Sequence, residues 1–358
     1  MAWLHRRGRA TGKQPIRRRT IAAVAVLLLA GATWITGPAA AVPAPSGPHP
    51  VARTEAALTA GARTIPLSIW YPTTTKPGAA PYIPASSLAA AAQMASKAAL
   101  WLHTPAAAPA MSATVLPISV DAPVAEGGLL PVVIWSPALG TPRWIASGLL
   151  MELASRGYVV VAIDHTGESP AVEVGGRVQV GNPPDAADHA FMQAALDMRI
   201  RDTRLVLSQL HTLPVVGARG DLDRMAMAGH SYGGQTAMAT MAVEPRIRTS
   251  LVLDGPAVWD GVEAAPDTDR PVLLLAMGAM VHASWTATDA SIVTLEGAGH
   301  YTGTDMPTFG CATDLCGTID PNRGAAITSA VMAAWLSGHL LGVDAAMPED
   351  PALRWRAG

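Results

Sequence analysis

The chain has 358 residues, of which 50% are hydrophobic and 15% charged. That composition fits one large α/β domain or two small ones, and only two cysteines exclude a scaffold built on disulfides. The formal net charge of −2 hides a basic N-terminus, because residues 1–41 hold seven of the 25 basic residues and no acidic one. The remainder has 18 basic and 27 acidic residues, a formal charge of −9, which argues against a nucleic-acid partner.

Residues 1–41 have the order basic, apolar, small that is typical of a secretory signal peptide. The apolar run Ile21–Ala32 follows the arginines, and Ala39–Ala41 offers small residues for cleavage. Arg18–Ile21 loosely resembles a twin-arginine export signal. The alternative is an uncleaved anchor, for which the 17 residues Ile21–Gly37 are marginal in length. We expect cleavage, secretion and no stable membrane span in the mature chain.

The mature chain is expected to form one domain without a linker that divides it. An early strand is predicted at Thr64–Tyr71, where apolar and small or polar residues alternate. Ser86–His103 is rich in alanine and has helical propensity, and it is expected to be either a lid over the site or a satellite helix. The expected segments are a flexible lead-in at 42–63, an α/β domain at 64–345 with an Ala-rich insertion at 82–128, and a tail at 346–358.

From Leu129 onward, short apolar runs alternate with helical segments. The runs are typical of strands buried on both faces: Leu129–Trp135, Tyr158–Ile163, Met225–Ala228, Ser250–Leu253, Val272–Ala276 and Ile292–Leu295. Helices are predicted at Ile145–Arg156, Asp185–Leu210, Gln235–Val243 and Ala325–Leu341. This alternation predicts an α/β fold with a mostly parallel central sheet and helices on both faces.

The strand predicted at Met225–Ala228 runs into Gly-His-Ser-Tyr-Gly, and a helical segment follows. That order predicts a nucleophile elbow with Ser231 at its tip, as in the α/β-hydrolase fold. Gly229 and Gly233 would flank the serine because a side chain at either position would collide with the neighbouring strand or helix. The pattern alone can be an ordinary turn, but its strand–turn–helix context makes Ser231 the predicted nucleophile.

The catalytic base is expected among the histidines that follow the serine, because the chain order in α/β-hydrolases is Ser, acid, His. His300 lies in a glycine-rich loop after the last predicted strand and is the predicted base. His282 follows the preceding strand and is the alternative, or else lines a pocket. His339 falls inside the last helix, where packing is the simpler role.

Asp254 is the predicted acid because it directly follows the strand Ser250–Leu253, at the strand end where an imidazole could be oriented. Many α/β-hydrolases place the acid one strand later, but here no carboxylate follows Val272–Ala276 until Asp289. The alternative role for Asp254 is to cap a turn with Gly255. The competing acids lie farther out in a polar loop: Asp260, Glu263, Asp267 and Asp269.

The oxyanion hole requires two N–H donors. One is expected from Tyr232, the residue after the nucleophile. The other is expected from the loop 136–140, Ser-Pro-Ala-Leu-Gly, after the first buried strand. Pro137 has no N–H, and of the remaining candidates, Ala138 and Leu139, the latter is preferred.

These residues resemble the platelet-activating factor acetylhydrolase (plasma/type II) family of α/β-hydrolases, in its bacterial exported branch. The resemblance covers about residues 64–305 and implies Ser231, Asp254 and His300 as the triad, with Leu139 and Tyr232 as oxyanion donors. The family usually has Ser-His-Gly-Leu-Gly where this chain has Ser-Pro-Ala-Leu-Gly, which bears on substrate scope. The matching stretches are 68–72, 131–136, 157–165, 199–207, 229–234, 253–255 and 297–300.

The sequence therefore predicts a secreted serine hydrolase that cleaves a carboxylic ester, either an acyl lipid or a short-chain ester, through an acyl-enzyme. The alternatives are a polyester or cutinase-like hydrolase and a non-catalytic binding protein on the same fold. No cofactor or metal is expected, because the sequence contains no zinc, phosphate-loop or dinucleotide signature. Export would also allow a disulfide between Cys311 and Cys316.

Overall fold

The computed structural model describes residues 41–182, 184–264, 269–278 and 282–356. All of these residues belong to one compact unit of the chain, Ala39–Gly358. The signal peptide predicted over residues 1–41 therefore lies outside the described residues, apart from Ala41.

A ten-stranded sheet forms the centre of the described part of the chain, in the order β14-β13-β12-β11-β10-β6-β7-β2-β1-β5. The strands from β13 to β7 in this order are mutually parallel, whereas β2, β1 and β14 join by antiparallel pairs. This arrangement confirms the predicted α/β fold with a mostly parallel sheet. The ten strands are β1 Val51–Ala60, β2 Arg63–Pro72, β5 Ser119–Val120, β6 Leu130–Ser136, β7 Val159–Ile163, β10 Gly220–His230, β11 Ile247–Leu253, β12 Val272–Met277, β13 Ser291–Leu295 and β14 Leu353–Trp355.

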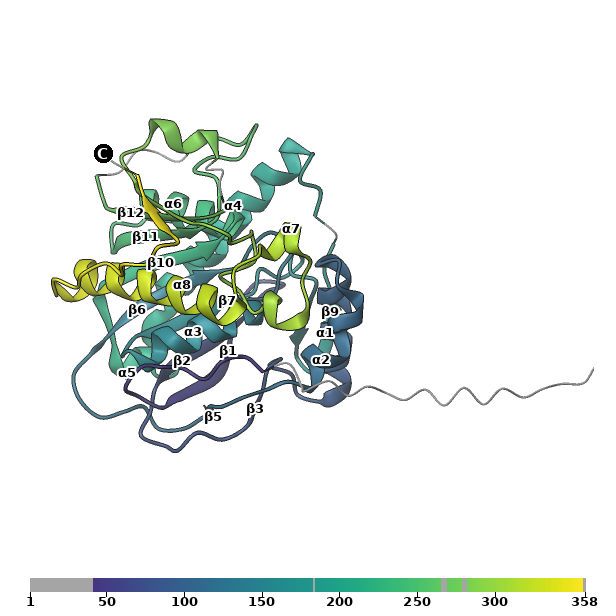
Figure 1. Cartoon of the computed structure of the whole chain (residues 1–358). Helices are drawn as coiled ribbons and strands as arrows, with labels where there is room; N and C mark the ends of the chain where they lie inside the picture. The colour runs from purple at the N-terminus through teal and green to yellow at the C-terminus, as the bar shows by residue number, and fades with distance from the viewer. Residues whose placement is uncertain (1–40, 183, 265–268, 279–281, 357–358) are drawn as a thin grey trace, which may run out of the picture. The chain divides into compact units, whose positions relative to one another are not determined.

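Helices cover both faces of this sheet (Figure 1). Helices α3 (Ser147–Ser155) and α8 (Pro321–Leu336) pack on one face, while α4 (His189–Gln209) and α6 (Tyr232–Val243) pack on the other. Neighbouring residues of β6 enter opposite cores, because successive side chains of a strand point to opposite faces. That burial on both faces explains why the central strands are continuous apolar runs.

Capping side chains set where the helices begin. Helix α4 begins at His189 rather than at the predicted Asp185, because the Asp188 carboxylate accepts the N–H groups of residues 190 and 191. Helix α8 begins after Asp320, which caps it, and its Trp335 points inward and donates to Thr249 Oγ1 at 2.8 Å.

The closing helix is the one described segment long and apolar enough to cross a membrane. It runs over Pro321–Leu341, and 56% of its most apolar window is buried inside the fold. A π-helical turn, η6 (Ser337–Leu341), ends it. Its burial is that of a core helix packed on the sheet.

Two expectations at the ends of the domain were wrong. The segment 42–63 was expected to be flexible, but it contains β1. This strand forms a β-hairpin with β2, and the two-residue loop of the hairpin includes Gly61 at φ 59°. The tail 346–358 contains β14, which extends the sheet beside β13. Strand β1 is rich in small or polar residues, and β14 is only three residues long, so neither sequence has the apolar pattern that predicts a strand.

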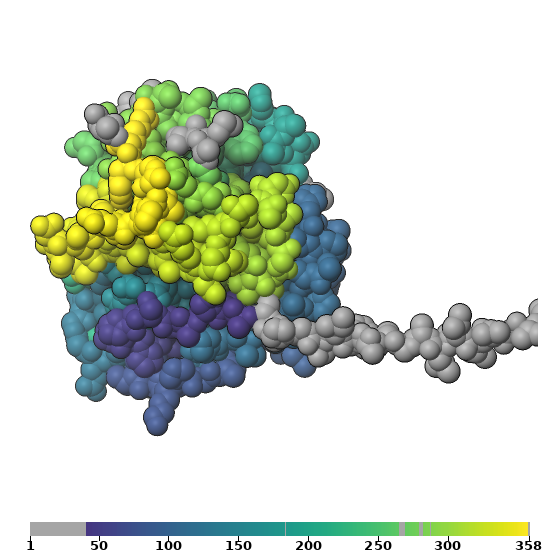
Figure 2. Space-filling model, in the orientation of Figure 1, coloured from purple at the N-terminus to yellow at the C-terminus, as the bar shows by residue number. Residues whose placement is uncertain are grey.

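The Ala-rich insertion forms helices α1 (Leu88–Trp101) and α2 (Ala108–Ala113), which lie next to the hairpin of β8 (Ala171–Val174) and β9 (Arg177–Val180) (Figure 1). In Figure 2 these blue helices lie beside the yellow-green segment that follows β13. The remaining short elements are β3 Ala80–Pro81, β4 Val115–Leu116, η1 Pro105–Ala107, η2 Arg143–Ala146, η3 Leu210–Thr212, α5 Val216–Arg219, η4 Ala283–Ala287, η5 Met306–Phe309 and α7 Thr313–Cys316.

Candidate active site

The chain turns sharply at Ser231, where β10 ends and α6 begins. The serine is buried, with 8% of its surface exposed, and its backbone has φ 54° and ψ −122°, a conformation that costs energy for a non-glycine residue. The flanking glycines leave no room for side chains. A Cβ on Gly229 would lie 2.2 Å from the backbone of Gly233, and one on Gly233 would lie 2.1 Å from Ser136 O.

Asp254 lies at the carboxyl end of β11, directly beside the serine turn. The Ser231 N–H donates to Leu253 O at 2.7 Å. The two oxygens of the Asp254 carboxylate have different partners: Oδ1 accepts the Met277 N–H at 2.7 Å, and Oδ2 contacts His300 Nδ1 at 2.6 Å. A backbone group of the next strand, β12, therefore fixes the rotation of the carboxyl group that faces the imidazole.

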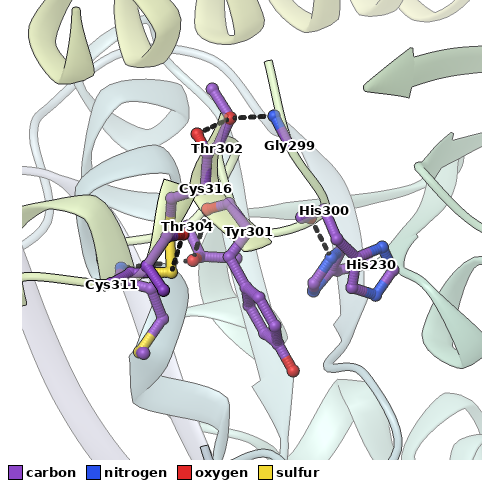
Figure 3. The surroundings of a disulfide bond; sticks show 10 residues. His230, Gly299, His300, Tyr301, Thr302, Thr304, Cys311 and Cys316 are labelled. Carbon is purple, nitrogen blue, oxygen red and sulfur yellow. Dashed lines mark hydrogen bonds between the residues drawn. A yellow bond between two sulfur atoms is a disulfide. The ribbon is translucent and has the colours of Figure 1, made fainter. Parts of the chain in front are cut away.

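The loop that carries His300 is held by its own hydrogen bonds and by a disulfide-closed segment (Figure 3). The Gly299 N–H donates to Thr302 Oγ1 at 2.8 Å, and that hydroxyl donates to Cys316 O at 2.9 Å. Cys316 is joined to Cys311, which confirms the predicted disulfide. The bridge thus lies two hydrogen bonds away from the residue before His300.

His230 packs against His300, with ring centroids 4.6 Å apart (Figure 3). Its Nε2 lies 2.7 Å from His300 O, and because a carbonyl only accepts, Nε2 carries the proton. Burial and the neighbouring His300 hold the pKa of His230 well below its usual range. His230 is therefore neutral and places no positive charge against the His300 imidazole.

The two N–H groups expected to form an oxyanion hole come from adjacent segments. Ser136 O and Pro137 O lie against the start of α6, where a Cβ on Gly233 would meet both. Leu139 packs on the apolar cluster that contains Tyr232. Neither the Leu139 N–H nor the Tyr232 N–H donates to an atom of the residues that the structure describes. Both N–H groups therefore have no hydrogen-bond acceptor among the described residues.

The alternative candidates lie elsewhere. His282 caps η4 and bonds with Ser284, and His339 packs its ring 4.1 Å from Trp335. Asp260, Glu263 and Asp269 are exposed, and Asp267 lies outside the described residues.

Sequence reasoning missed the buried polar groups behind the loop 136–140. His165 and Glu168 follow β7, and Arg199 and Asp202 come from α4, and all four are buried. Their signal in the sequence was slight. His165 lies two residues after the end of β7, and the stretches that resemble the family, 157–165 and 199–207, contain three of the four residues.

Comparison with known proteins identifies the family. The family described as "Platelet-activating factor acetylhydrolase, isoform II" matches residues 35–193 and 201–346. A platelet-activating factor acetylhydrolase from Cavia porcellus is 30% identical over 165 residues, which are 39% of this chain and 38% of that protein. A "Probable 1-alkyl-2-acetylglycerophosphocholine esterase" from Arthroderma benhamiae is 29% identical over 156 residues, 43% of this chain and 38% of that protein.

A longer match is the platelet-activating factor acetylhydrolase from Gallus gallus, 24% identical over 63% of this chain and 65% of that protein. The matches therefore span less than two thirds of these relatives' own length. Among solved structures, a ferulic acid esterase from Streptomyces cinnamoneus superposes with a TM-score of 0.73 at 25% identity. It covers 88% of this chain and 99% of its own.

These proteins are named as esterases or acetylhydrolases, in line with the predicted carboxylic ester hydrolase, and the superposition confirms the α/β-hydrolase fold. The family match extends over most of the described residues, including β10 to β13 and the loops after them. The chain belongs to the platelet-activating factor acetylhydrolase, isoform II family.

Proposed function

We propose that this chain is a serine hydrolase of carboxylic esters, with Ser231 as nucleophile, His300 as base and Asp254 as the acid that orients it. The observation that carries the proposal is the 2.6 Å contact between His300 Nδ1 and Asp254 Oδ2, next to a serine held in a strained turn. The two unpaired N–H groups of Leu139 and Tyr232 supply the oxyanion hole.

The reaction proceeds in two halves. Ser231 Oγ attacks the ester carbonyl while His300 Nε2 takes its proton, and Asp254 stabilises the resulting imidazolium. The tetrahedral oxyanion accepts hydrogen bonds from the two N–H groups and collapses, and His300 protonates the departing alkoxide. Water, deprotonated by His300, then attacks the acyl-enzyme. The acid leaves, and Ser231 regains its proton.

The substrate class we propose is an acyl lipid or a short-chain ester, supported by the names of the relatives in this family. This chain has Pro137-Ala138 where the family usually has His-Gly, a difference that bears on substrate scope. A polyester, cleaved by the same mechanism, is therefore the alternative substrate. Acyl-chain preference should follow from a series of p-nitrophenyl esters of increasing chain length.

We also propose that the protein acts outside the cytoplasm after cleavage near residue 41. The basic, apolar, small order of residues 1–41 supports this, as does the disulfide, which persists in oxidising compartments. N-terminal sequencing of the protein from the culture medium tests it. A chain that still begins at Met1 would contradict cleavage.

Two measurements test the enzymatic proposal. Ser231→Ala should lower kcat for p-nitrophenyl acetate by about 10⁴-fold or more, as removal of an activated serine does. A fluorophosphonate probe should label the wild type at Ser231. Equal hydrolysis by the wild type and Ser231→Ala would refute the proposal, and a wild type that the probe does not label would favour a binding protein.

A further inference from the structure

The loop that carries Leu139 is held from behind by a buried ion pair between Arg199 of α4 and Glu168. Arg199 is 1% exposed, and its Nε donates to Glu168 Oε2 at 2.7 Å, while its Nη2 contacts the other carboxylate oxygen. The same guanidinium donates to Pro137 O at 2.8 Å and to Ala138 O at 3.0 Å. Glu168 Oε1 accepts the Gly140 N–H at 3.1 Å.

These contacts fix both peptide units that flank the Cα of Leu139. Ala138 C=O and Leu139 N–H belong to one planar trans peptide unit, so they point in opposite directions. A guanidinium bonded to Ala138 O therefore directs the Leu139 N–H away from Arg199. The Gly140 N–H, bonded to Glu168, prevents rotation of the following peptide unit.

The charge of the pair also acts on the donor. Burial opposes ionisation of Glu168, but the charge and hydrogen bond of Arg199, together with His165 and the Gly140 N–H, hold the pKa of that carboxyl below its usual value. The pair is therefore ionised. A cation bonded to Ala138 O draws electron density toward that oxygen, which makes the N–H of the same peptide unit a stronger donor.

The ion pair is itself tied to the sheet. Ser136 Oγ accepts from Arg199 Nη1 at 3.1 Å and lies 3.0 Å from His165 Nε2, whose Nδ1 lies 3.0 Å from Asp202. The contacts run from Ser136 to His165 to Asp202, as in a catalytic triad. These residues are at most 3% exposed, however, and Arg199 already binds the serine hydroxyl. This group supports the loop and has no access to substrate.

We propose that Arg199 and Glu168 are positioning residues for ester hydrolysis, which aim and polarise the Leu139 N–H at the oxyanion. The inference rests on the proposed function. Arg199 binds the loop through two backbone carbonyls, Pro137 O and Ala138 O, so its hold does not require an N–H at Pro137.

The test is Arg199→Lys. The lysine keeps the positive charge opposite Glu168, but a single ammonium cannot reproduce the planar fork that binds two carbonyls and a carboxylate. With p-nitrophenyl acetate we expect kcat to fall about 10²-fold, as for loss of one oxyanion donor, with KM within about twofold. The rate of labelling by a fluorophosphonate should fall in parallel, because that reaction also develops charge on an oxygen in the oxyanion site.

The matched control is Arg53→Lys. Arg53 is also a buried guanidinium, 3% exposed, that binds two carbonyls, Pro81 O and Tyr82 O, and a carboxylate, Glu55. It makes no contact with the loop 136–140. Both variants should lower the thermal unfolding midpoint, but Arg53→Lys should leave kcat unchanged. Equal losses of kcat in the two variants would show a merely structural role and overturn the inference.

A second variant, Glu168→Gln, serves if Arg199→Lys does not fold. Glutamine keeps an oxygen for the Gly140 N–H and removes the charge that holds Arg199, so kcat should fall about tenfold with KM unchanged. If folded Arg199→Lys or Glu168→Gln has the kcat of the wild type, the inference is wrong, even though the proposed function still holds as long as Ser231→Ala is inactive. Activity that survives Ser231→Ala overturns the proposed function instead.

Discussion

Replacing Asp254 by asparagine should reverse the tautomer of His300. The Met277 N–H, 2.7 Å from Oδ1, requires an acceptor at that position. Asparagine has one acceptor and one donor group, so its oxygen takes the place next to Met277 and its NH₂ faces His300 Nδ1. The imidazole must then accept at Nδ1 and carry its proton on Nε2, where it cannot take the proton of Ser231.

The size of the effect follows from how firmly the backbone enforces this orientation. The opposite amide rotamer would place two donors together at Met277, at a cost of about 1–3 kcal/mol for an unsatisfied N–H. The tautomer of His300 that carries its proton on Nδ1 and can accept the Ser231 proton at Nε2 is therefore a minor species. The imidazolium that forms also loses the negative charge of the Asp254 carboxylate. Together these effects should lower kcat by about 10⁴-fold, with little change in the fold.

The assay is hydrolysis of p-nitrophenyl acetate by the wild type, Asp254→Asn and Asp260→Asn, with thermal unfolding of each. Asp260 is an exposed acid in the same region of the chain, so its variant controls for the loss of one carboxylate. It should keep wild-type kcat. If Asp254→Asn retains more than a tenth of the wild-type kcat while folded, the assignment of the acid is wrong.

Three further predictions concern stability. Burial raises the pKa of Asp305 to about 7, above about 3.9 in the unfolded chain. The folded state thus holds this proton more tightly, and stability should fall by roughly 3 kcal/mol as pH rises from 4 to 7, a decline that Asp305→Asn removes in urea titrations. Cys311→Ser with Cys316→Ser should lower the unfolding free energy by about 2 kcal/mol and reduce kcat. Gly233→Ala should not yield a stable fold, because its Cβ would lie 2.1 Å from Ser136 O.

Each of these predictions has its own control. An equal pH dependence in Asp305→Asn and the wild type would contradict the first. A reductant should affect the wild type but not the double cysteine variant, and an effect on both would contradict the second. Gly128→Ala, where an added Cβ meets nothing within 4 Å, should melt as the wild type does. A Gly233→Ala protein that melts with it would contradict the third.

The central strands could be predicted from the sequence because burial on both faces makes them continuous apolar runs. The predicted run Tyr158–Ile163 differs by one residue from β7, and the run Ile292–Leu295 differs by one from β13. Strands β1 and β14 could not be predicted, because the residues of β1 are largely small or polar and β14 is only three residues long. The spacing of apolar residues along a strand reflects which of its faces are buried. A strand with one exposed face and small side chains therefore shows only a weak apolar pattern.

The candidate site was predictable to a similar extent. Ser231, Asp254 and His300 each follow a strand end, and the topology brings Asp254 and His300 into contact. Their chemical roles remain predictions. The pairing of Arg199 with Glu168 was missed because the two residues meet across 31 residues of sequence, and the stretch 199–207 that resembles the family does not indicate a partner for Arg199. Contacts of this kind depend on how α4 crosses the sheet, which no local pattern specifies.

The bond between the Asp254 carboxylate and the Met277 backbone has an evolutionary consequence. The ends of the adjacent strands β11 and β12 meet at this bond, so we expect that an acid at the end of either strand would reach the same imidazole. A lineage could pass through a chain with carboxylates on both strands and then lose one, without an inactive intermediate. The position of the acid in the sequence would then depend on the lineage, whereas its position next to the imidazole would be the same in every lineage because the reaction requires it.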